Sequence, residues 1–114
     1  MPNNINNVLS QFIQGITKII GKDLKKVILY GSYARNTQNQ DGETSDIDIM
    51  ILVDVPENNI RIIQKKVLDY SADIDLEYNV LISPLIESVN NYNDRVKYML
   101  FYKNVEKEGK VLYA

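Results

Sequence analysis

The sequence predicts a small α/β sandwich, with one sheet covered by helices, in a single domain over residues 1–114. Three observations support this fold class. Helical and strand-like apolar patterns alternate along the chain in the order α-β-α-β-α-β-α. The length of 114 residues allows one hydrophobic core but not two. Apolar residues make up 45% and charged residues 25% of the chain, as in ordinary globular domains.

The composition narrows the chemistry that the chain can carry out. It contains no cysteine and no histidine, so disulfides, thiolate chemistry and the usual zinc ligands are excluded. A bound metal must therefore be held by oxygen atoms, as magnesium, manganese and calcium are. The net charge of −2 does not favour a nucleic-acid partner.

Neither a membrane span nor a secretory signal is recognisable. No segment has the roughly 18 consecutive apolar residues that a membrane helix needs. The first residues, MPNNINNVLSQF, lack the basic start and the small-residue cleavage site of a signal peptide. We therefore expect a cytoplasmic protein without a membrane partner.

The first element is predicted to be an amphipathic helix that ends at about Gly21, a residue suited to a C-cap. Its apolar residues recur at three- and four-residue spacing and are Ile5, Val8, Leu9, Phe12, Ile13, Ile16, Ile19 and Ile20. The run Leu24–Tyr30 is apolar and rich in β-branched residues, which predicts a central strand. Gly31 interrupts this strand, and Ser32 is suited to cap a short helix over residues 32–38.

A surface loop, a second strand and a helix are expected next. The turn-forming residues NQDGETS, at positions 39–45, predict the loop. The second strand is predicted over Asp46–Val53, and Pro56 is suited to the first turn of the helix. We expect that helix to end near Ala72. The apolar residues that give it helical spacing are Ile60, Ile63 and Val67.

The last third of the chain is predicted to combine strands and helices. The third strand is predicted over Asp73–Ser83, and a further helix is expected to start at Pro84. Residues 93–108 follow a helical pattern with one interruption, and Gly109 is suited to its C-cap. The final residues 110–114, KVLYA, predict a short terminal strand.

Two aspartates, Asp46 and Asp48, open the second strand, although aspartate is depleted in strands. Alternate strand residues share a face, so we expect both carboxylates on one face, about 6.6 Å apart along the strand. Like charges placed in this way repel each other unless a cation or hydrogen-bond donors lie between them. Two divalent metal ions would remove the repulsion and create a site for phosphoryl chemistry. The alternative is an exposed strand start where the acids meet water.

The turn at Gly31 and Ser32 follows a strand and opens a helix. Glycine lets a ligand approach the backbone closely, and N–H groups at a helix start favour anions. Arg35 could contact either a phosphate or a surface acid. Together with the acid pair, this turn predicts a site for a metal–nucleoside triphosphate. A calcium-binding loop does not fit, because Asp46 occupies the glycine position of that motif.

The segments GSYARN (31–36) and SDIDIMI (45–51) resemble the two-part G-S-x-A-x-G and S-D-x-D signature of the nucleotidyltransferase superfamily that includes DNA polymerase β. More narrowly, the chain is similar to the minimal nucleotidyltransferases. The resemblance implies a mixed sheet of three or four strands backed by helices. It also implies that the Gly31–Ser32 turn holds a triphosphate, while Asp46 and Asp48 hold two Mg²⁺ ions, with Mn²⁺ as the alternative.

The resemblance further implies a reaction and a partner. A nucleoside monophosphate, AMP from ATP in the leading hypothesis, would be transferred to a hydroxyl group as pyrophosphate leaves. Many minimal nucleotidyltransferases act as antitoxins that modify a tyrosine of a helical HEPN-type partner. We therefore expect ATP or another nucleoside triphosphate as ligand. A HEPN-type protein or a second copy of the chain is expected to complete a site that is shallow in so short a chain.

The sequence departs from the family pattern at the third carboxylate, which the family takes from a neighbouring strand. In the predicted third strand that position is Asn79, whose amide could bind metal but could not act as a base. Glu77 and Asp75 lie two and four residues earlier, and either could replace it. The rival hypothesis is therefore a catalytically degenerate module that binds nucleotide or a toxin by contact alone.

Overall fold

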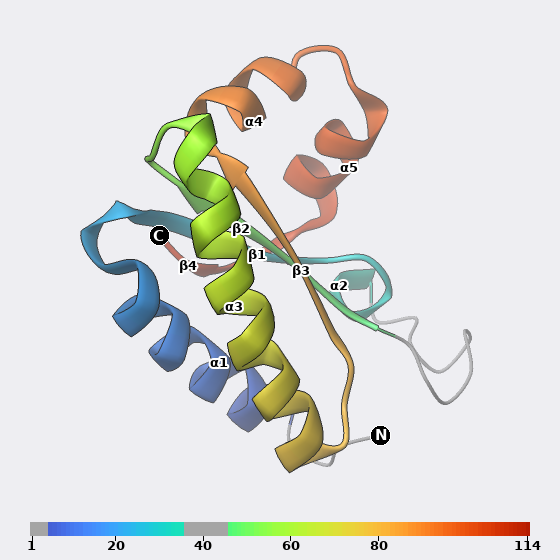
Figure 1. The fold of residues 1–114 in the computed structure, drawn as a ribbon. Coiled ribbons are helices and arrows are strands. Elements are labelled where there is room, and N and C mark those ends of the chain that lie inside the picture. The colour runs from blue at the N-terminus through green and yellow to red at the C-terminus, as the bar shows by residue number, and fades with distance from the viewer. Residues whose placement is uncertain (1–4, 36–45) are drawn as a thin grey trace.

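The computed structural model describes residues 5–35 and 46–114 and shows a four-stranded sheet in the order β3-β2-β1-β4 (Figure 1). β1 pairs antiparallel with β2 and with β4, whereas β2 and β3 are parallel, so the sheet is mixed. The strands are β1 (Leu24–Tyr30), β2 (Ile47–Val53), β3 (Ile82–Ser88) and β4 (Lys110–Tyr113). The helices are α1 (Ile5–Ile20), the 3₁₀ turn η1 (Gly21–Asp23), α2 (Ser32–Arg35), α3 (Glu57–Tyr78), α4 (Val89–Arg95) and α5 (Leu100–Glu108).

The first half of the prediction is confirmed. α1 ends at Ile20, and Gly21 follows it with a positive φ of 73°. β1 has the predicted bounds and an interior place in the sheet, and β2 begins one residue later than predicted. α2 begins at Ser32 itself, so this residue is the first of the helix and does not precede it as a cap. The predicted loop 39–45 lies outside the described residues.

The second half contains the largest error, because α3 continues to Tyr78 and absorbs most of the predicted third strand. The segment DIDLEY alternates polar and apolar residues and so resembles a strand. In the structure its two aliphatic side chains differ in burial: Ile74 is 1% exposed and Leu76 is 85% exposed. Ile74 continues the helical row of Val67 and Ser71, which faces the core. Helical periodicity therefore overrides the local alternation.

The third strand lies further along the chain than predicted, at Ile82–Ser88. The helix expected to start at Pro84 is wrong, since Pro84 is inside β3. Proline is tolerated there because β3 is an edge strand, where a missing N–H can face away from the sheet. The next helix, α4, starts at Val89 and is capped by the Ser88 hydroxyl, which accepts from the Asn91 N–H at 3.1 Å. The interruption predicted within 93–108 is confirmed between α4 and α5.

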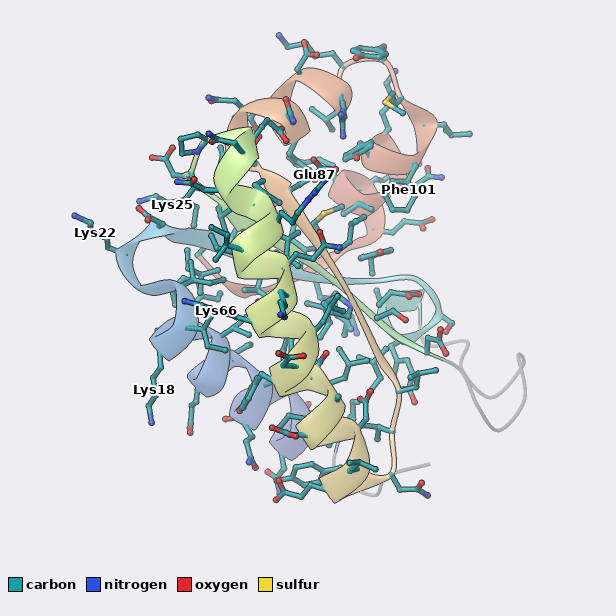
Figure 2. The ribbon with its side chains drawn as sticks, in the orientation of Figure 1. Lys18, Lys22, Lys25, Lys66, Glu87 and Phe101 are labelled. Carbon is teal, nitrogen blue, oxygen red and sulfur yellow. The ribbon has the colours of Figure 1, made fainter. Side chains whose placement is uncertain are left out.

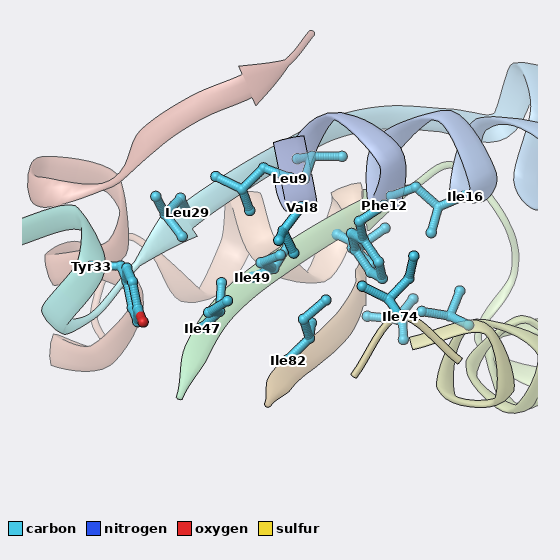
Figure 3. Packing of buried hydrophobic residues seen from close by; sticks show 14 of the residues in the cluster. Val8, Leu9, Phe12, Ile16, Leu29, Tyr33, Ile47, Ile49, Ile74 and Ile82 are labelled. Atoms are coloured by element: carbon cyan, nitrogen blue, oxygen red, sulfur yellow. The ribbon is translucent and has the colours of Figure 1, made fainter. Parts of the chain in front are cut away.

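The two faces of the sheet carry different cores. α1 and α3 cover one face, and Figure 3 shows their buried side chains against Leu29, Ile47 and Ile49. α4 and α5 contribute to a smaller cluster on the other face, around Met50 and Leu52. Alternate residues of β2 enter the two clusters, which explains why nearly the whole strand is buried. No helix within the described ranges is long and apolar enough to cross a membrane.

Candidate active site

The acid pair lies at the start of β2, where the sequence predicts it. Ile47, Ile49 and Ile51 are buried in the larger core, so the residues between them face the opposite side of the sheet. Asp48 stands opposite Tyr30 of β1 and opposite Ser83 of β3. The Ser83 hydroxyl donates a hydrogen bond of 3.2 Å to Asp46 Oδ2. Both acids are therefore gathered around the first residues of the β2–β3 pair.

Gly31 brings the turn directly against the second acid. Its φ of 75° lies in the left-handed region that side chains disfavour. A Cβ atom at this position would stand 2.4 Å from Asp48 Oδ2. Glycine is thus required for the backbone conformation and for the close approach of the carboxylate. Gly31 and Asp48, one from each half of the sequence motif, are therefore in contact in the fold.

The other two residues of the predicted phosphate site are placed by the same turn. Ser32 is buried at the start of α2 and follows Gly31 directly. Arg35 is the last residue of α2, but its side chain lies outside the described part of the structure. The assignment of Arg35 to phosphate therefore stays a prediction.

A third acid, Asp75, lies close to this pair, although it comes from a helix. Its Oδ1 accepts a hydrogen bond of 2.9 Å from the Ile82 N–H, which seats it at the start of β3. Burial raises the pKa of Asp75; the bond from Ile82 opposes this rise, and the negative charge of Asp46 adds to it. The sequence placed Asp75 on a strand, whereas the last turns of α3 carry it to the same end of β2.

The strand placement of Glu77 and Asn79 is wrong, and with it the reason for proposing them as catalytic. Glu77 is exposed on α3 and accepts a hydrogen bond of 3.4 Å from Gln11 Nε2 of α1. Asn79 is the C-cap of α3 and adopts a left-handed conformation with φ 54°, which asparagine tolerates better than most residues. The strand that pairs with β2 presents Ser83 to Asp48 instead.

Tyr30 forms the neighbouring wall of the site. Burial raises the pKa of Tyr30 to about 12, and the negative charge of Asp48 adds to the rise. Its hydroxyl therefore stays protonated over the physiological range. Its ring packs edge-on against Phe101 of α5, with 5.6 Å between ring centroids.

The donor atoms present fit a magnesium ion. Mg²⁺ prefers oxygen ligands and is commonly held by one or two carboxylates together with waters and substrate phosphates. Asp46 and Asp48 present carboxylates, and the turn at Gly31 lies against the carboxylate of Asp48. Within residues 5–35 and 46–114, no cluster of three or more Asp, Glu, His or Cys is placed to hold a metal by itself.

The same face of the sheet carries a second acid, Glu87, further along β3 (Figure 2). Glu87 is 9% exposed and forms an ion pair with Arg95 of α4, with 3.0 Å between Nη1 and Oε2. The Tyr102 hydroxyl of α5 donates to the same carboxylate and accepts from Arg95 Nη1. This network fixes α4 and α5 on β3. No sequence pattern predicts this network, because its members meet only in the fold.

The described surface has several hollows, and two of them lie against the elements discussed above. One, of about 190 Å³, lies between the end of β1 and one face of α5. Its lining residues are Tyr30, Gly31, Phe101, Asn104, Val105 and Glu108. The other, of about 640 Å³, lies between α1 and α3 and includes none of the motif residues. Only the smaller of these two hollows borders the phosphate turn.

A mixed α/β sheet that brings a glycine turn against an acid pair is the arrangement that the sequence predicts for a nucleotidyltransferase. Comparison with known proteins agrees: residues 9–111 match the family described as nucleotidyltransferase domain. The chain belongs to this family and is a nucleotidyltransferase. A Methanocaldococcus jannaschii protein named "Putative protein adenylyltransferase MJ0604" is 33% identical over 110 residues, covering 96% of this chain and 99% of that protein.

Solved structures share the fold at lower identity. A crystal structure titled as a toxin–antitoxin with AMP-PNP has a TM-score of 0.57 and 20% identity. The match covers 91% of this chain and 72% of that chain. A mutant of the toxin–antitoxin pair MntA–HpeT has a TM-score of 0.56 and 21% identity, over 92% of this chain and 72% of that one. These matches confirm the fold class.

Proposed function

We propose that this protein is a magnesium-dependent adenylyltransferase that transfers AMP from ATP to a hydroxyl group of a partner protein. The observation that carries the proposal is the contact between Gly31 and Asp48, which joins a phosphate turn to a metal-binding acid. Membership in the nucleotidyltransferase family and the name of the MJ0604 relative support the reaction type.

The residues have separate tasks in this proposal. Asp46 and Asp48 hold Mg²⁺, as one ion or two, and Mn²⁺ would serve the same ligands. The turn at Gly31 and Ser32, with Arg35, holds the triphosphate. When bound, the metal supplies positive charge where negative charge develops on the α-phosphate. Ser83 keeps the Asp46 carboxylate in position through its hydroxyl.

The bond changes follow from the reaction class. The acceptor oxygen forms a bond to the α-phosphorus, while the bond from that phosphorus to the bridging oxygen breaks. Pyrophosphate leaves and the acceptor loses its proton. The chain contributes chiefly by holding the triphosphate beside the acids, because phosphoryl transfer depends mainly on positioning and charge stabilisation.

The acceptor proposed is a tyrosine of a HEPN-type toxin, so that the chain acts as an antitoxin. Its structural neighbours are toxin–antitoxin assemblies, one of them with AMP-PNP. Phe101 packs against Tyr30 at the site, and its neighbours Tyr98 and Leu100 are also exposed, so this segment offers an apolar surface for a partner. A second copy of the chain is the alternative source of the missing wall.

The test is Asp48→Asn, assayed by transfer of label from ATP and by titration with a non-hydrolysable ATP analogue with and without Mg²⁺. We expect transfer to fall by about a thousandfold or more, with loss of magnesium-dependent binding and an unchanged fold. Asp69→Asn removes the same charge from an exposed position on α3 and serves as the control. Wild-type transfer in the Asp48→Asn variant would overturn the proposal.

One observation favours the rival, a module that binds a partner without catalysis. The family takes a third carboxylate from a neighbouring strand, but β3 presents Ser83 at the register of Asp48. A hydroxyl brings no charge to the metal and is a poor base at neutral pH. A toxin complex that forms and neutralises equally well with the Asp46→Asn/Asp48→Asn double variant would support the rival.

A further inference from the structure

The smaller hollow is built by one face of α5 against the end of β1. Its four α5 residues, Phe101, Asn104, Val105 and Glu108, follow the i, i+3, i+4, i+7 spacing of a single helix face. Its β1 side is Tyr30 and Gly31, so the phosphate turn forms part of its wall. Its volume of about 190 Å³ suits a single ring system, since a protein cavity of about 150 Å³ accepts benzene.

Phe101 supplies a rigid aromatic surface in this hollow (Figure 2). Its ring makes an edge-to-face contact with Tyr30 at 5.6 Å and another with Tyr102 at 5.2 Å. Despite these two contacts the side chain is 43% exposed. A large aromatic ring that is held in place and still open to solvent is ready to stack on a planar ligand.

Asn104 makes the hollow selective. A helix face that packs only on a core is apolar throughout, yet this face alternates Phe101 and Val105 with Asn104 and Glu108. An asparagine amide can accept from the exocyclic amine of adenine and donate to the adjacent ring nitrogen. A carboxylate beside it adds a second acceptor for that amine. Guanine in the same orientation would place its carbonyl oxygen against these acceptors.

We propose that the α5 hollow is the base-binding pocket of the enzyme, with Phe101 stacking on adenine and Asn104 selecting it over guanine. The proposal rests on the function proposed above, because a nucleotide must first place its phosphates at the Gly31–Ser32 turn. Gly31 belongs both to that turn and to the hollow, so a nucleotide held there has its base beside α5. Specificity for ATP then resides in the C-terminal helix, outside the two-part motif.

The test compares three probes in the presence of Mg²⁺: non-hydrolysable ATP, non-hydrolysable GTP and inorganic tripolyphosphate. Phe101→Ala is expected to weaken binding of the ATP analogue about tenfold or more. Asn104→Leu is expected to reduce the preference for the ATP over the GTP analogue by about tenfold. Neither substitution should change tripolyphosphate binding. Asn93→Leu, an exposed asparagine on α4, is the matched control, and thermal unfolding checks that each variant is folded.

The outcomes separate this proposal from the one it rests on. Tripolyphosphate binding with no change in base preference in either variant would overturn the pocket alone. Failure of the wild-type chain to bind any of the three probes would overturn the nucleotide site and the pocket together. Unchanged nucleotide affinity with loss of partner modification would assign the hollow to the acceptor side chain and overturn its assignment to adenine.

Discussion

Acidic residues lie in two halves of one face of the sheet, and their surroundings differ between the halves. In the half that we call the covered half, Glu87 lies under α4 and α5 and is paired with Arg95 and Tyr102 of the same chain. In the half that we call the acid half, Asp46 and Asp48 gather at the start of β2, with Asp75 near them. Both halves are built by the same two strands, four residues apart.

The difference shows how one sheet serves stability and function. A carboxylate that the chain pairs internally binds helices to the sheet, and its removal should affect unfolding. Carboxylates that are crowded together cost stability unless a cation lies between them, which is why we propose a cation in the acid half. The comparison therefore predicts that substitutions in the acid half affect activity, and substitutions in the covered half affect stability.

After Asp48→Asn, Gly31→Ala should give the next largest effect, because it drives a Cβ atom into the Asp48 carboxylate. We expect transfer to fall by at least about a hundredfold as the acid is displaced. Gly21→Ala is the matched control, since Gly21 has nearly the same φ of 73° but nothing within 4 Å of its Cβ position. Both variants should lose about 1–2 kcal/mol of stability through left-handed strain, measured by urea unfolding. Equal transfer activity in the two variants would show that the close approach of Gly31 to Asp48 is not needed for the reaction.

Glu87→Ala tests the covered half and should mainly affect stability. It leaves the Tyr102 hydroxyl and the Arg95 guanidinium without their shared acceptor. We expect the free energy of unfolding to fall by about 1–3 kcal/mol, below the cost of breaking a fully buried pair because Arg95 is partly exposed. Asp46→Asn should change the unfolding free energy much less, and in the stabilising direction, because it removes one of the crowded charges. The comparison would break if Asp46→Asn destabilised the chain as much as Glu87→Ala does.

Ser83→Ala removes the neutral hydroxyl that donates a hydrogen bond to Asp46 in the acid half. Residues that orient a metal ligand typically alter metal affinity by 10–100-fold, and this bond of 3.2 Å is a modest one. We therefore expect about a tenfold loss of Mg²⁺-dependent nucleotide affinity, measured by calorimetry. Ser83→Thr keeps the hydroxyl and should restore most of it. Equal losses in both variants would indicate a packing effect.

The reliable part of the prediction comes from local signals. β1 and β2 are short apolar runs bounded by glycine, acids and proline, and their positions follow from this local residue pattern. Successive strand residues point to opposite faces of a sheet, so the isoleucines and the acids of β2 are expected on opposite faces. Local patterns were not enough to predict that Gly31 lies against Asp48. That prediction also required the two-part motif and its resemblance to a family.

The errors come from signals that are resolved only by tertiary packing. At residues 73–78 a two-residue alternation and a helical repeat coexist, and burial of Ile74 in the core decides for the helix. Ser83 could not be assigned to the site without the register of β3 on β2. Asp75 was a candidate on a predicted strand, but the length of α3 decides where it lies. Pro84 was the available clue, because proline inside an apolar run suggests an edge strand as well as a helix start.

Asp75→Asn should have the smallest effect, and it tests whether the third acid belongs to the acid half. The folded-state pKa of Asp75 is raised above its ordinary value of 3.8, first by burial and further by Asp46. The stability that this carboxyl contributes is therefore fully present below pH 3.8 and is lost as the pH rises through the folded pKa. Asparagine can still accept from the Ile82 N–H but has no proton to lose.

The variant should consequently lose less stability than the wild type as the pH rises from about 4 towards neutrality. Urea midpoints measured across this range would show it as a slightly more stable chain at neutral pH. Asp69→Asn, on an exposed face of the same helix, controls for the change in net charge. Asp46→Asn should reproduce part of the effect, because the charge of Asp46 is one cause of the raised pKa. If it reproduces none, Asp75 responds to burial alone and the acid half consists of Asp46 and Asp48.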